Sequence, residues 1–459
     1  MSVGVIVLGA GRGTRMRSET AKVLHEACGR TLLDWVLGAV EHLDADRAIV
    51  VVGHQAEAVA ATLPRGVNSV LQEPQNGTGH AVRVALDGFE ALPESIVVLP
   101  GDMPLITAEA VSDLLTHHHE TGASATIMSV VLDDPTGYGR IVRQGDAVSH
   151  IVEEGDATDD ERSILEVNTS VYVFRSEALA EALEQITIDN AQGEYYLTDV
   201  IGILDARGDR VTAMTVAPEL GIGVNTHAQL AQVSDVLRRR ITSQLLDSGV
   251  WMLDPQRVYI DATVTVEPTA KLYPEVYLTG STTVGAGASV GPNVEAANTA
   301  IGTGAVVKQA VMMDATIGRD ALVGPFAYLR PGAVLEDGSK VGTYVEVKGS
   351  TVGAGSKVPH LSYIGDTTIG ENSNIGAGTI TVNYDGHAKH KTTIGDRVRI
   401  GSDTMLIAPV TVGDDALTGA GSVITHDVPE GALGISRDPQ HNIDGYAEKR
   451  RKRAEREQD

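Results

Sequence analysis

The second half of the chain repeats a six-residue pattern of an aliphatic residue, a glycine or other small residue, and polar positions. Between Val264 and Ile424 the aliphatic–glycine pair recurs at Val284-Gly285, Val290-Gly291, Ile301-Gly302, Ile317-Gly318, Val323-Gly324, Val341-Gly342, Val352-Gly353, Ile369-Gly370, Ile375-Gly376, Ile394-Gly395, Ile400-Gly401 and Val412-Gly413. A hexapeptide period predicts a parallel β-helix, in which each hexad forms one side of a triangular coil and its aliphatic residue points inward. Glycine is favoured at the corners, where a Cβ would obstruct the chain. A β-sandwich would need period-two alternation, which this segment lacks.

The first half alternates apolar strands with amphipathic helices. Strands are predicted over 3–8, 48–52 and 96–99, and helices over 32–40 and 80–86. This alternation is typical of an α/β doubly wound, Rossmann-like domain with a mostly parallel sheet covered on both faces. Such sheets bind ligands beyond the carboxyl ends of their strands.

These patterns divide the chain into four segments. We expect the α/β domain over 1–226, a linker helix over 227–248, the β-helix over 249–437 and a charged tail over 438–459. The tail carries five consecutive basic residues, and a charged end of this kind is expected to be disordered. The linker helix is predicted from apolar residues at helical spacing, namely Leu230, Val233, Leu237, Ile241 and Leu245.

Three small features have ordinary structural interpretations. The run Arg238 to Arg240 is expected on the solvated face of the linker helix. The run His117 to His119 is expected at an exposed helix end, with no further metal ligands nearby in sequence. Cys28 is the only cysteine, which excludes internal disulfides and fits a reducing compartment. We expect it to be a small, buried or half-buried residue.

Composition narrows the classes of partner. With 459 residues, of which 42% are hydrophobic, the chain is expected to hold two or three domains. A net charge of −25 argues against nonspecific binding to nucleic acid or to an anionic membrane. The apolar start is too short, and lacks the basic leader, of a signal peptide, and no run reaches membrane-spanning length. We expect a cytoplasmic protein with no membrane span.

The first predicted strand leads directly into a glycine-rich turn with basic residues. The segment reads Gly9-Ala10-Gly11-Arg12-Gly13-Thr14-Arg15-Met16, and Lys22 follows. Glycines let backbone N–H groups approach phosphate oxygens, and Arg15 and Lys22 supply positive charge. Thr14 stands where a dinucleotide fingerprint needs glycine, and the Gly-Lys-Ser/Thr of a Walker P-loop is absent. The turn therefore predicts an anion site of another kind, with a purely structural turn as the alternative.

A second candidate site lies where the hexapeptide pattern breaks. His360 and Tyr363 lie within the repeats, and the polar segment 381–389, which includes Asn383 and Lys389, should project as a loop. Arg330 and Lys348 from preceding coils add positive charge. A lone histidine is usually structural, but here it is the one general-base candidate of a basic pocket.

The glycine-rich turn resembles the opening motif of the sugar nucleotidyltransferases, L-x-x-G-x-G-T-R-M followed by P-K-x-L. Gly9 replaces the commoner alanine, and Ala21 replaces the proline before Lys22. The segments 72–81 and 100–105 narrow the resemblance to the bacterial N-acetylglucosamine-1-phosphate uridylyltransferases. The family usually has a second asparagine where Thr226 stands.

The resemblance implies roles for residues of the first half. Asp102 and Asn225 would hold Mg²⁺, with Lys22 and Arg15 as the catalytic cations, while Gln72, Gly77 and Thr78 would read the uracil. The UTP and UDP-N-acetylglucosamine set as a whole would comprise Leu8, Gly9, Ala10, Gly11, Lys22, Gln72, Gly77, Thr78, Gly139, Glu153, Asn168 and Asn225, of which Gly139, Glu153 and Asn168 would hold the acetylamino sugar.

The same resemblance extends over the second half. The hexapeptide family it resembles forms left-handed β-helices that assemble as trimers, with each acetyltransferase pocket between subunits. His360 would take a proton from the amine of glucosamine-1-phosphate, with Ser402 orienting it. The sugar-phosphate set would be Arg330, Lys348, Tyr363, Asn374 and Lys389, and the acetyl-CoA set Ala377, Asn383, Tyr384, Ser402, Ala420 and Arg437. His387 has no counterpart and is expected to be solvent-exposed.

The resemblance implies a bifunctional enzyme that acetylates glucosamine-1-phosphate and then transfers uridylyl from UTP to the product. The expected partners are these small molecules, acetyl-CoA, Mg²⁺ and two further copies of the chain. One alternative is a monofunctional nucleotidyltransferase with the β-helix as a scaffold, but a scaffold needs none of the residues between His360 and Lys389. Another is a catalytically inactive subunit, against which the intact Lys22, Asp102 and Asn225 argue.

Overall fold

The computed structural model describes residues 2–43, 45–145 and 147–457. The chain separates into two compact units, 1–241 and 242–459. The boundary falls inside helix α8 (His227–Asp247), which occupies the predicted linker position. No helix in the described part of the chain is long and apolar enough to cross a membrane.

The first unit is built on one mixed sheet. Its strand order is β11-β7-β10-β6-β1-β4-β5, with β8 and β9 joined at the side through β10. Strand β1 runs parallel to both β4 and β6, so the chain leaves the sheet in the crevice where the strand order reverses. The strands are β1 (Val3–Leu8), β4 (Arg47–Val52), β5 (Val67–Leu71), β6 (Ser95–Pro100), β7 (Ala125–Val131), β8 (Arg140–Gln144), β9 (Ala147–Val152), β10 (Glu166–Arg175) and β11 (Val211–Thr215), with a small hairpin of β2 (Glu26–Ala27) and β3 (Arg30–Thr31).

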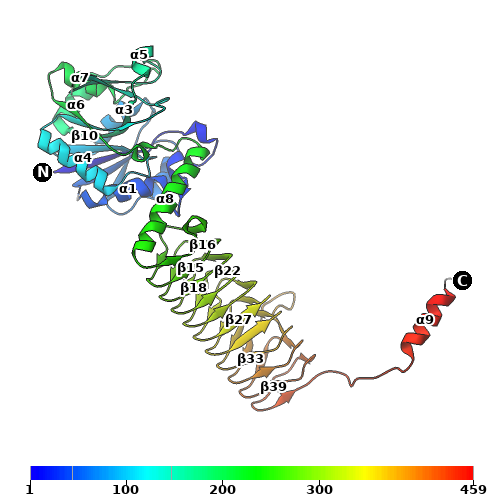
Figure 1. Ribbon diagram of the computed structural model, residues 1–459. Helices are drawn as coiled ribbons and strands as arrows, with labels where there is room; N and C mark the ends of the chain where they lie inside the picture. Colours follow the sequence, from blue (N-terminus) through cyan, green and yellow to red (C-terminus); the bar gives the residue numbers. More distant parts are fainter. Residues whose placement is uncertain (1, 44, 146, 458–459) are drawn as a thin grey trace. The chain divides into compact units, whose positions relative to one another are not determined.

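Helices cover both faces of this sheet, as the alternating pattern predicts (Figure 1). One apolar core lies under α1, α2 and α4, and the other lies under α3, α6 and α7. The helices are α1 (Leu32–Val40), α2 (Ala56–Ala61), α3 (Thr78–Leu86), α4 (Ala108–Thr121), α5 (Asp159–Arg162), α6 (Ser176–Leu183) and α7 (Asp199–Ala206), with 3-10 turns η1 (Thr14–Met16), η2 (Lys22–Leu24), η3 (Glu41–Leu43) and η4 (Pro218–Gly221).

The second unit winds as a left-handed parallel β-helix with three sheets, one for each side of the coil (Figure 1). The first sheet consists of β12 (Trp251–Met252), β15 (Lys271–Leu272), β18 (Ser289–Val290), β21 (Val306–Val307), β24 (Leu322–Val323), β27 (Lys340–Thr343), β30 (Lys357–His360), β33 (Asn374–Ile375), β36 (Arg399–Ile400), β39 (Leu417–Thr418) and β41 (Leu433–Gly434). The short turn η5 (Pro255–Arg257) follows β12.

The second and third sheets complete each coil. The second consists of β13 (Val258–Ile260), β16 (Val276–Thr279), β19 (Val294–Ala297), β22 (Ala310–Met313), β25 (Ala327–Leu329), β28 (Glu346–Lys348), β31 (Tyr363–Gly365), β34 (Ile380–Val382), β37 (Met405–Ile407) and β40 (Val423–Ile424). The third consists of β14 (Thr265–Val266), β17 (Thr283–Val284), β20 (Ala300–Ile301), β23 (Thr316–Ile317), β26 (Val334–Leu335), β29 (Thr351–Val352), β32 (Thr367–Ile369), β35 (Thr392–Ile394) and β38 (Val410–Val412).

The aliphatic residues of the hexads stack in register inside the coil, as predicted. On the third sheet, for example, one residue of each coil is buried above its counterpart in the next: Val266, Val284, Ile301, Ile317, Leu335, Val352, Ile369, Ile394 and Val412. The interior of the coil is filled by aliphatic side chains, whereas large aromatic residues of this unit such as Tyr277, Phe326 and Tyr344 are exposed on its outside.

Three local predictions were wrong. Residues 446–456 of the tail form helix α9 (Tyr446–Arg456), whose alanine, lysine, arginine and glutamate residues favour a helix; Lys452 pairs with Glu448 at 2.7 Å. His118 is buried on α4, where its Nδ1 lies 3.0 Å from Thr126 Oγ1. In the run Arg238 to Arg240, the middle residue is exposed, whereas Arg238 is mostly buried and pairs with Asp235, and Arg240 pairs with Glu219 at 2.9 Å.

Candidate functional sites

The first unit contains a cavity of about 640 Å³ at the carboxyl ends of β1 and β6. Every residue that the sequence predicts for uridylyl transfer lines it: Leu8, Gly9, Ala10, Gly11, Arg15, Lys22, Gln72, Gly77, Thr78, Asp102, Gly139, Glu153, Asn168 and Asn225. These residues come from segments more than 200 positions apart. The fold therefore brings the whole predicted set together within one unit.

The glycine-rich turn is shaped by close contacts with the segment that carries Lys22. Gly13 has a left-handed φ of 60°, and a Cβ there would lie 2.7 Å from Cβ of Lys22, so only glycine fits without strain. Gln55 holds the same segment from the other side, because its Oε1 accepts the N–H of Ala21 at 2.9 Å. The replacement of the family proline by Ala21 thus leaves a backbone donor that Gln55 uses.

A cluster of charged and amide groups forms the centre of the cavity. Lys22 forms an ion pair with Asp102, and its ammonium also donates to Asn225 Oδ1 at 3.0 Å. Arg15 donates to the same oxygen at 2.9 Å. The side chains of Lys22 and Asp102 are 16% and 13% exposed, so these charges interact in a largely water-excluded space.

The start of helix α8 fixes Asn225. Thr226 Oγ1 accepts the N–H of Gln229 at 3.2 Å, and Gln229 Oε1 accepts the N–H of Asn225 at 2.8 Å. This is a variant of the capping box, in which two side chains satisfy helix-terminal donors reciprocally. Thr226, which stands where the family usually has asparagine, therefore caps helix α8 and leaves Asn225 in place.

The two ends of the cavity differ in character. At one end Gln72, which is 4% exposed, donates to the carbonyl of Gly77 at 2.9 Å, and Thr78 Oγ1 accepts the N–H of Leu197 at 3.0 Å. These bonds fix a polar edge suited to a flat heterocycle.

At the other end Thr198 donates to Glu153 at 3.1 Å, and Asn168 donates to the Tyr172 hydroxyl at 2.7 Å. Burial raises the pKa of Glu153, and it also raises that of Tyr172. Asn168 and Gly139 are joined through the backbone, since the N–H of Asn168 donates to the Gly139 carbonyl at 2.9 Å.

Sequence reasoning missed other residues that line this cavity. Gln229 could have been found from the Thr-x-x-Gln spacing of a capping box at the start of the predicted linker helix. Arg12 lies in the glycine-rich turn and Gln75 in the segment 72–81, but neither was assigned a role. Thr136, Ser170 and Glu194 carry no motif signal of their own and are placed in the cavity by the fold.

On the β-helix, part of the predicted sugar-phosphate set lies at the corner that follows the second sheet. Arg330 pairs with Glu346 at 2.9 Å, and Lys348 pairs with Asp366 at 2.7 Å. Tyr363 lies on the same sheet in register with Glu346. A Cβ on Gly365 would lie 2.7 Å from Cε1 of Tyr363 and 2.7 Å from Nδ2 of Asn383, so the absent side chain makes room for both.

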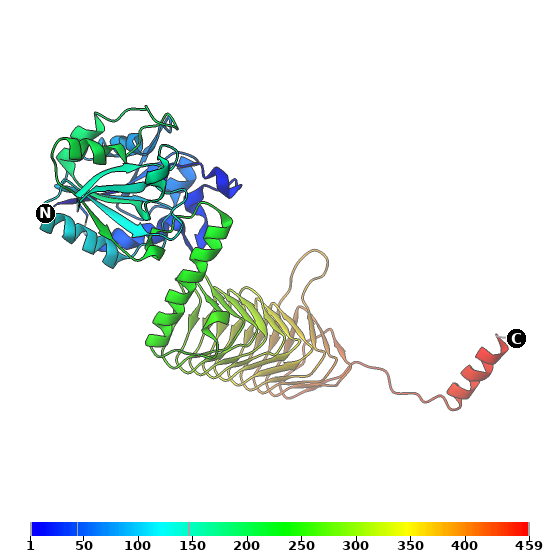
Figure 2. The ribbon, with the colours of Figure 1, turned by 45° about the horizontal axis from the view of Figure 1, so that its top comes forward.

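The interruption of the repeats forms a projecting loop at the same corner (Figure 2). Lys357 pairs with Asn374, 17 positions on, whereas Asn374 pairs with Arg399, 25 positions on. Residues 383–391 supply the extra length. Thr381 differs from the prediction, because it lies buried in β34 and the loop begins after it. His387 is exposed, as predicted.

His360 and most of the predicted acetyl-CoA set lie at another corner, at the end of the first sheet. Thr343 pairs with His360 in register, and His360 immediately precedes a left-handed corner residue, Leu361. The next three coils have an equivalent corner, and the residue before it is Ala377, Ser402 or Ala420. Backbone hydrogen bonds align these corners, because the N–H of Asp403 donates to the Ala377 carbonyl and the N–H of Gly421 donates to the Ser402 carbonyl. Arg437 ends this column, because its Nη1 donates to the Ala420 carbonyl at 2.5 Å.

Within one chain, the residues predicted for acetyl transfer do not all lie at one place. Asn374 lies in the first sheet, on β33, whereas Lys348 and Tyr363 lie in the second. Ser402 forms no hydrogen bond with His360 within the described residues, so its orienting role stays a prediction.

Both halves of the chain match known protein families. Residues 5–199 match the model of the MobA-like NTP transferase domain, and residues 391–426 match that of the bacterial transferase hexapeptide (six repeats). The Bifunctional protein GlmU of Streptomyces avermitilis is 48% identical over 97% of this chain and 94% of its own length. The protein of the same name from Thermobifida fusca is 48% identical over 97% of this chain and 94% of its own length. That of Brevibacillus brevis is 44% identical over 97% of this chain and 97% of its own length.

The chain belongs to the GlmU family of bifunctional proteins. Identity at this level runs through both units, so neither half is an unrelated attachment. The two alternatives left open by the sequence, a scaffolding β-helix and an inactive subunit, are thereby disfavoured. As a member of this family the chain is a bifunctional enzyme.

Proposed function

We propose that the two reactions take place at two separate sites, uridylyl transfer in the cavity of the first unit and acetyl transfer on the β-helix. The chain is a uridylyltransferase and N-acetyltransferase of UDP-N-acetylglucosamine synthesis. The observation that supports the first assignment most directly is that all fourteen residues predicted for uridylyl transfer line one cavity.

In the first reaction, an oxygen of N-acetylglucosamine-1-phosphate attacks the α-phosphorus of UTP, and pyrophosphate leaves. Such a reaction needs positioning and charge neutralisation more than a dedicated acid or base. The Lys22 ammonium and the Arg15 guanidinium, which meet at Asn225, would neutralise phosphate charge. Gln72, Gly77 and Thr78 would bind the uracil, and Gly139, Glu153 and Asn168 the acetylamino sugar.

Asp102 and Asn225 fit a Mg²⁺ ion. Both offer oxygen donors, which Mg²⁺ prefers, and a Cβ on Gly223 would lie 3.9 Å from Asn225 Nδ2 and from both Asp102 oxygens, so the two side chains border one space. The described residues contain no group of three or more His, Cys, Asp or Glu that could hold a metal, so water and phosphate would have to supply the remaining ligands. When bound, Mg²⁺ would neutralise charge that develops on the phosphates.

In the second reaction, His360 would accept a proton from the 2-amino group of glucosamine-1-phosphate. The neutral amine attacks the acetyl-CoA thioester, the amide bond forms, and CoA leaves as a thiol after protonation. Arg330, Lys348, Tyr363, Asn374 and Lys389 would bind the sugar phosphate. The acetyl-CoA side would be formed by Ala377, Asn383, Tyr384, Ser402, Ala420 and Arg437.

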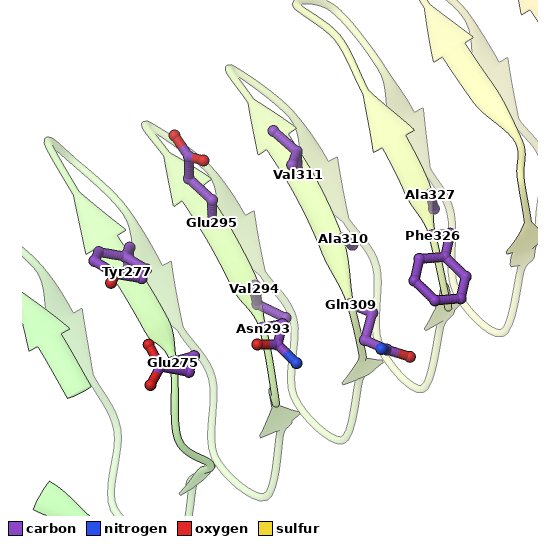
Figure 3. Close-up of a pocket in the computed structure, with 10 residues that line it drawn as sticks. All are labelled: Glu275, Tyr277, Asn293, Val294, Glu295, Gln309, Ala310, Val311, Phe326 and Ala327. Carbon is purple, nitrogen blue, oxygen red and sulfur yellow. The ribbon is translucent and has the colours of Figure 1, made fainter. Parts of the chain in front are cut away.

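We also propose that the β-helix assembles as a homotrimer through its second sheet. The outward residues of this sheet form one row in register, Tyr259, Tyr277, Glu295, Val311 and Tyr328. Figure 3 shows part of a groove of about 500 Å³ along this row, lined by Tyr277 and Val311 and by Phe326 from the corner. The third sheet instead carries small, mostly polar outward residues, Thr265, Thr283, Ala300 and Thr316.

An exposed groove of this size, which combines Tyr277, Val311 and Phe326 with the charged Glu275 and Glu295, favours contact with another protein surface. A second copy of the chain is the occupant that the rest of the site favours. The same outward row continues through Glu346 and Tyr363 into the sugar-phosphate cluster. Asn374 lies on the first sheet of the same chain, so the Asn374 that completes this cluster would come from a partner chain. A neighbouring copy that covers the second sheet would bring its first sheet, and its Asn374, to this edge.

One assay tests both activities in the full chain. Purified protein is given glucosamine-1-phosphate, acetyl-CoA, UTP and Mg²⁺, and free thiol and pyrophosphate are followed separately. Omission of acetyl-CoA should abolish both products, whereas N-acetylglucosamine-1-phosphate in its place should restore pyrophosphate alone. Rapid pyrophosphate release from the unacetylated sugar, or no thiol release at all, would contradict the assignment.

A further inference from the structure

The carboxylate of Asp366 connects two parts of the proposed acetyl-transfer site that the sequence assigns to different substrates. Its Oδ1 accepts from the Lys348 ammonium at 2.7 Å, and its Oδ2 accepts from the Asn383 amide at 2.6 Å. Lys348 belongs to the proposed sugar-phosphate set and Asn383 to the proposed acetyl-CoA set. The three residues lie on successive coils, at or next to the ends of β28, β31 and β34.

The backbone alone does not explain an aspartate at this position. Asp366 has a φ of 49°, in the left-handed region, where glycine, asparagine and aspartate are tolerated best. Asn298 and Asp314 have the same conformation at the same corner of earlier coils. Asp314 is exposed, whereas the Asp366 side chain is only 19% exposed and uses both oxygens on neighbouring coils.

The charges around Asp366 reinforce each other. Burial alone would raise the pKa of its carboxyl, but hydrogen bonds from Lys348 and Asn383 and the charges of Lys348 and Lys389 bring that pKa below its ordinary value. In return, the hydrogen bond to Asp366 raises the pKa of Lys348. Both groups are therefore charged at neutral pH, and the carboxylate fixes the position of the ammonium.

Asn383 also forms the base of the projecting loop. Its carbonyl accepts the N–H of His390 at 2.8 Å, and Tyr384 and Lys389 face each other across an isolated antiparallel bridge just above. A bond from Asp366 to the Asn383 side chain therefore attaches this loop base to the coil that precedes it. The loop carries Tyr384 and Lys389, two further members of the proposed site.

We propose that Asp366 is a positioning residue for acetyl transfer, which holds the Lys348 ammonium and the base of the 383–391 loop in one arrangement. Without its charge, Lys348 and the loop move independently, and the sugar phosphate must order them on binding. Because the substrate then has to order these groups when it binds, loss of the Asp366 charge raises KM more than it lowers kcat. This inference rests on the proposed acetyltransferase function of the β-helix.

The test compares Asp366→Asn with Asp314→Asn in the full-length protein. Asparagine tolerates the left-handed corner and can still accept from Asn383, so the change removes mainly the charge that faces Lys348. We expect Asp366→Asn to raise KM for glucosamine-1-phosphate about tenfold and to change kcat less than about threefold. Pyrophosphate release and Tm should stay at wild-type values. Asp314→Asn removes a charge at the same corner outside the site and should leave all these quantities unchanged.

A second background shows whether Asp366 acts through Lys348. In a Lys348→Met protein, Asp366→Asn should change KM for glucosamine-1-phosphate by less than about twofold, because the group that the carboxylate positions is gone. A wild-type KM in Asp366→Asn, or an equal effect in both backgrounds, would overturn the proposal. A wild-type chain that released no CoA would instead contradict the acetyltransferase function itself.

Discussion

The two sites differ in how much of each is contained in one chain. In the first unit the predicted residues converge on a single cavity, with Lys22, Asp102 and Asn225 in direct contact at its centre. On the β-helix the predicted residues are distributed over two corners and a third position on β33. A doubly wound sheet creates a crevice where its strand order reverses, whereas a solenoid offers flat sides and edges. A site on a solenoid therefore depends on loops, and on a second surface to close it.

The largest expected effect tests whether the first site is independent. Asp102→Ala should lower Mg²⁺-dependent pyrophosphate release by at least about 10³-fold, because both the carboxylate partner of Lys22 and a proposed metal ligand are lost. CoA release should stay near the wild-type rate. Asp113→Ala, on the exposed side of α4, is the matched control. Full uridylyl transfer by the Asp102 variant would refute the metal assignment.

The converse change separates the second site from the first. His360→Ala should lower acetyl transfer by at least about 10²-fold, the usual loss when a general base is removed, while uridylyl transfer is unchanged. His387→Ala, in the exposed loop, should leave both activities intact. Both rates are measured with the same preparation. Acetylation near the wild-type rate in His360→Ala would make this histidine a structural residue of the coil.

A third change asks whether assembly matters for one site only. Val311→Glu replaces an apolar residue of the groove on the second sheet with a charge, and Thr316→Glu places a charge on the third sheet. We expect Val311→Glu to dissociate the proposed trimer and to lower acetyl transfer at least about tenfold, with pyrophosphate release per chain unchanged. Thr316→Glu should sediment as the wild type does. A trimeric Val311→Glu protein would show that the second sheet is not the contact surface.

A further expected effect concerns acid stability, in which the two units also differ. Burial lowers the pKa of His118 to about 4, whereas the described part of the β-helix buries Ser, Thr and Asn but no ionisable polar side chain. The folded first unit prefers neutral His118, so its contribution is complete above the unfolded pKa of about 6.5 and is lost as pH falls toward 4. The difference between the folded and unfolded pKa of His118 corresponds to about 3 kcal/mol of unfolding free energy.

Denaturant unfolding at pH 7 and pH 4.5 measures this contribution. In a Trp251→Phe background, the fluorescence of Trp35 reports the first unit. His118→Gln should flatten the pH dependence of its unfolding free energy, while His117→Gln should keep it. Equal pH dependence in both variants would show that His118 is not the group responsible.

The sequence predicted most of the fold because its signals are local and repeated. The hexads of the second half specify the coil, since each aliphatic residue is buried above the next. The glycine-rich turn and Lys22 follow a strand end, where a doubly wound sheet places its ligands. Ser170 and Glu194 lie in the same cavity but belong to no motif, because only the folded sheet brings them there.

Other features depend on tertiary contacts that one sequence does not display. His118 differs from its neighbours in burial because of the face of α4 on which it lies, and the run of three histidines obscures that periodicity. Asp366 follows a glycine in an ordinary turn signature, and its importance arises from Lys348 and Asn383 on adjacent coils. In the tail, the run of basic residues predicts disorder, but the alanine and glutamate residues around it favour the helix that forms.

We propose that the first site is complete in one chain, whereas the second is completed by a neighbouring chain. The most direct test mixes two variants, Lys348→Ala and Asn374→Ala, each of which we expect to have strongly reduced acetyl transfer alone. They are co-expressed with different tags, and assemblies that carry both tags are isolated. If Lys348 and Asn374 of one pocket come from different chains, about one site in three of each mixed trimer has both residues intact. We predict that acetyl transfer returns to about that fraction of wild type, with pyrophosphate release at the wild-type rate throughout. Mixed trimers as inactive as either variant alone would contradict a pocket shared between chains.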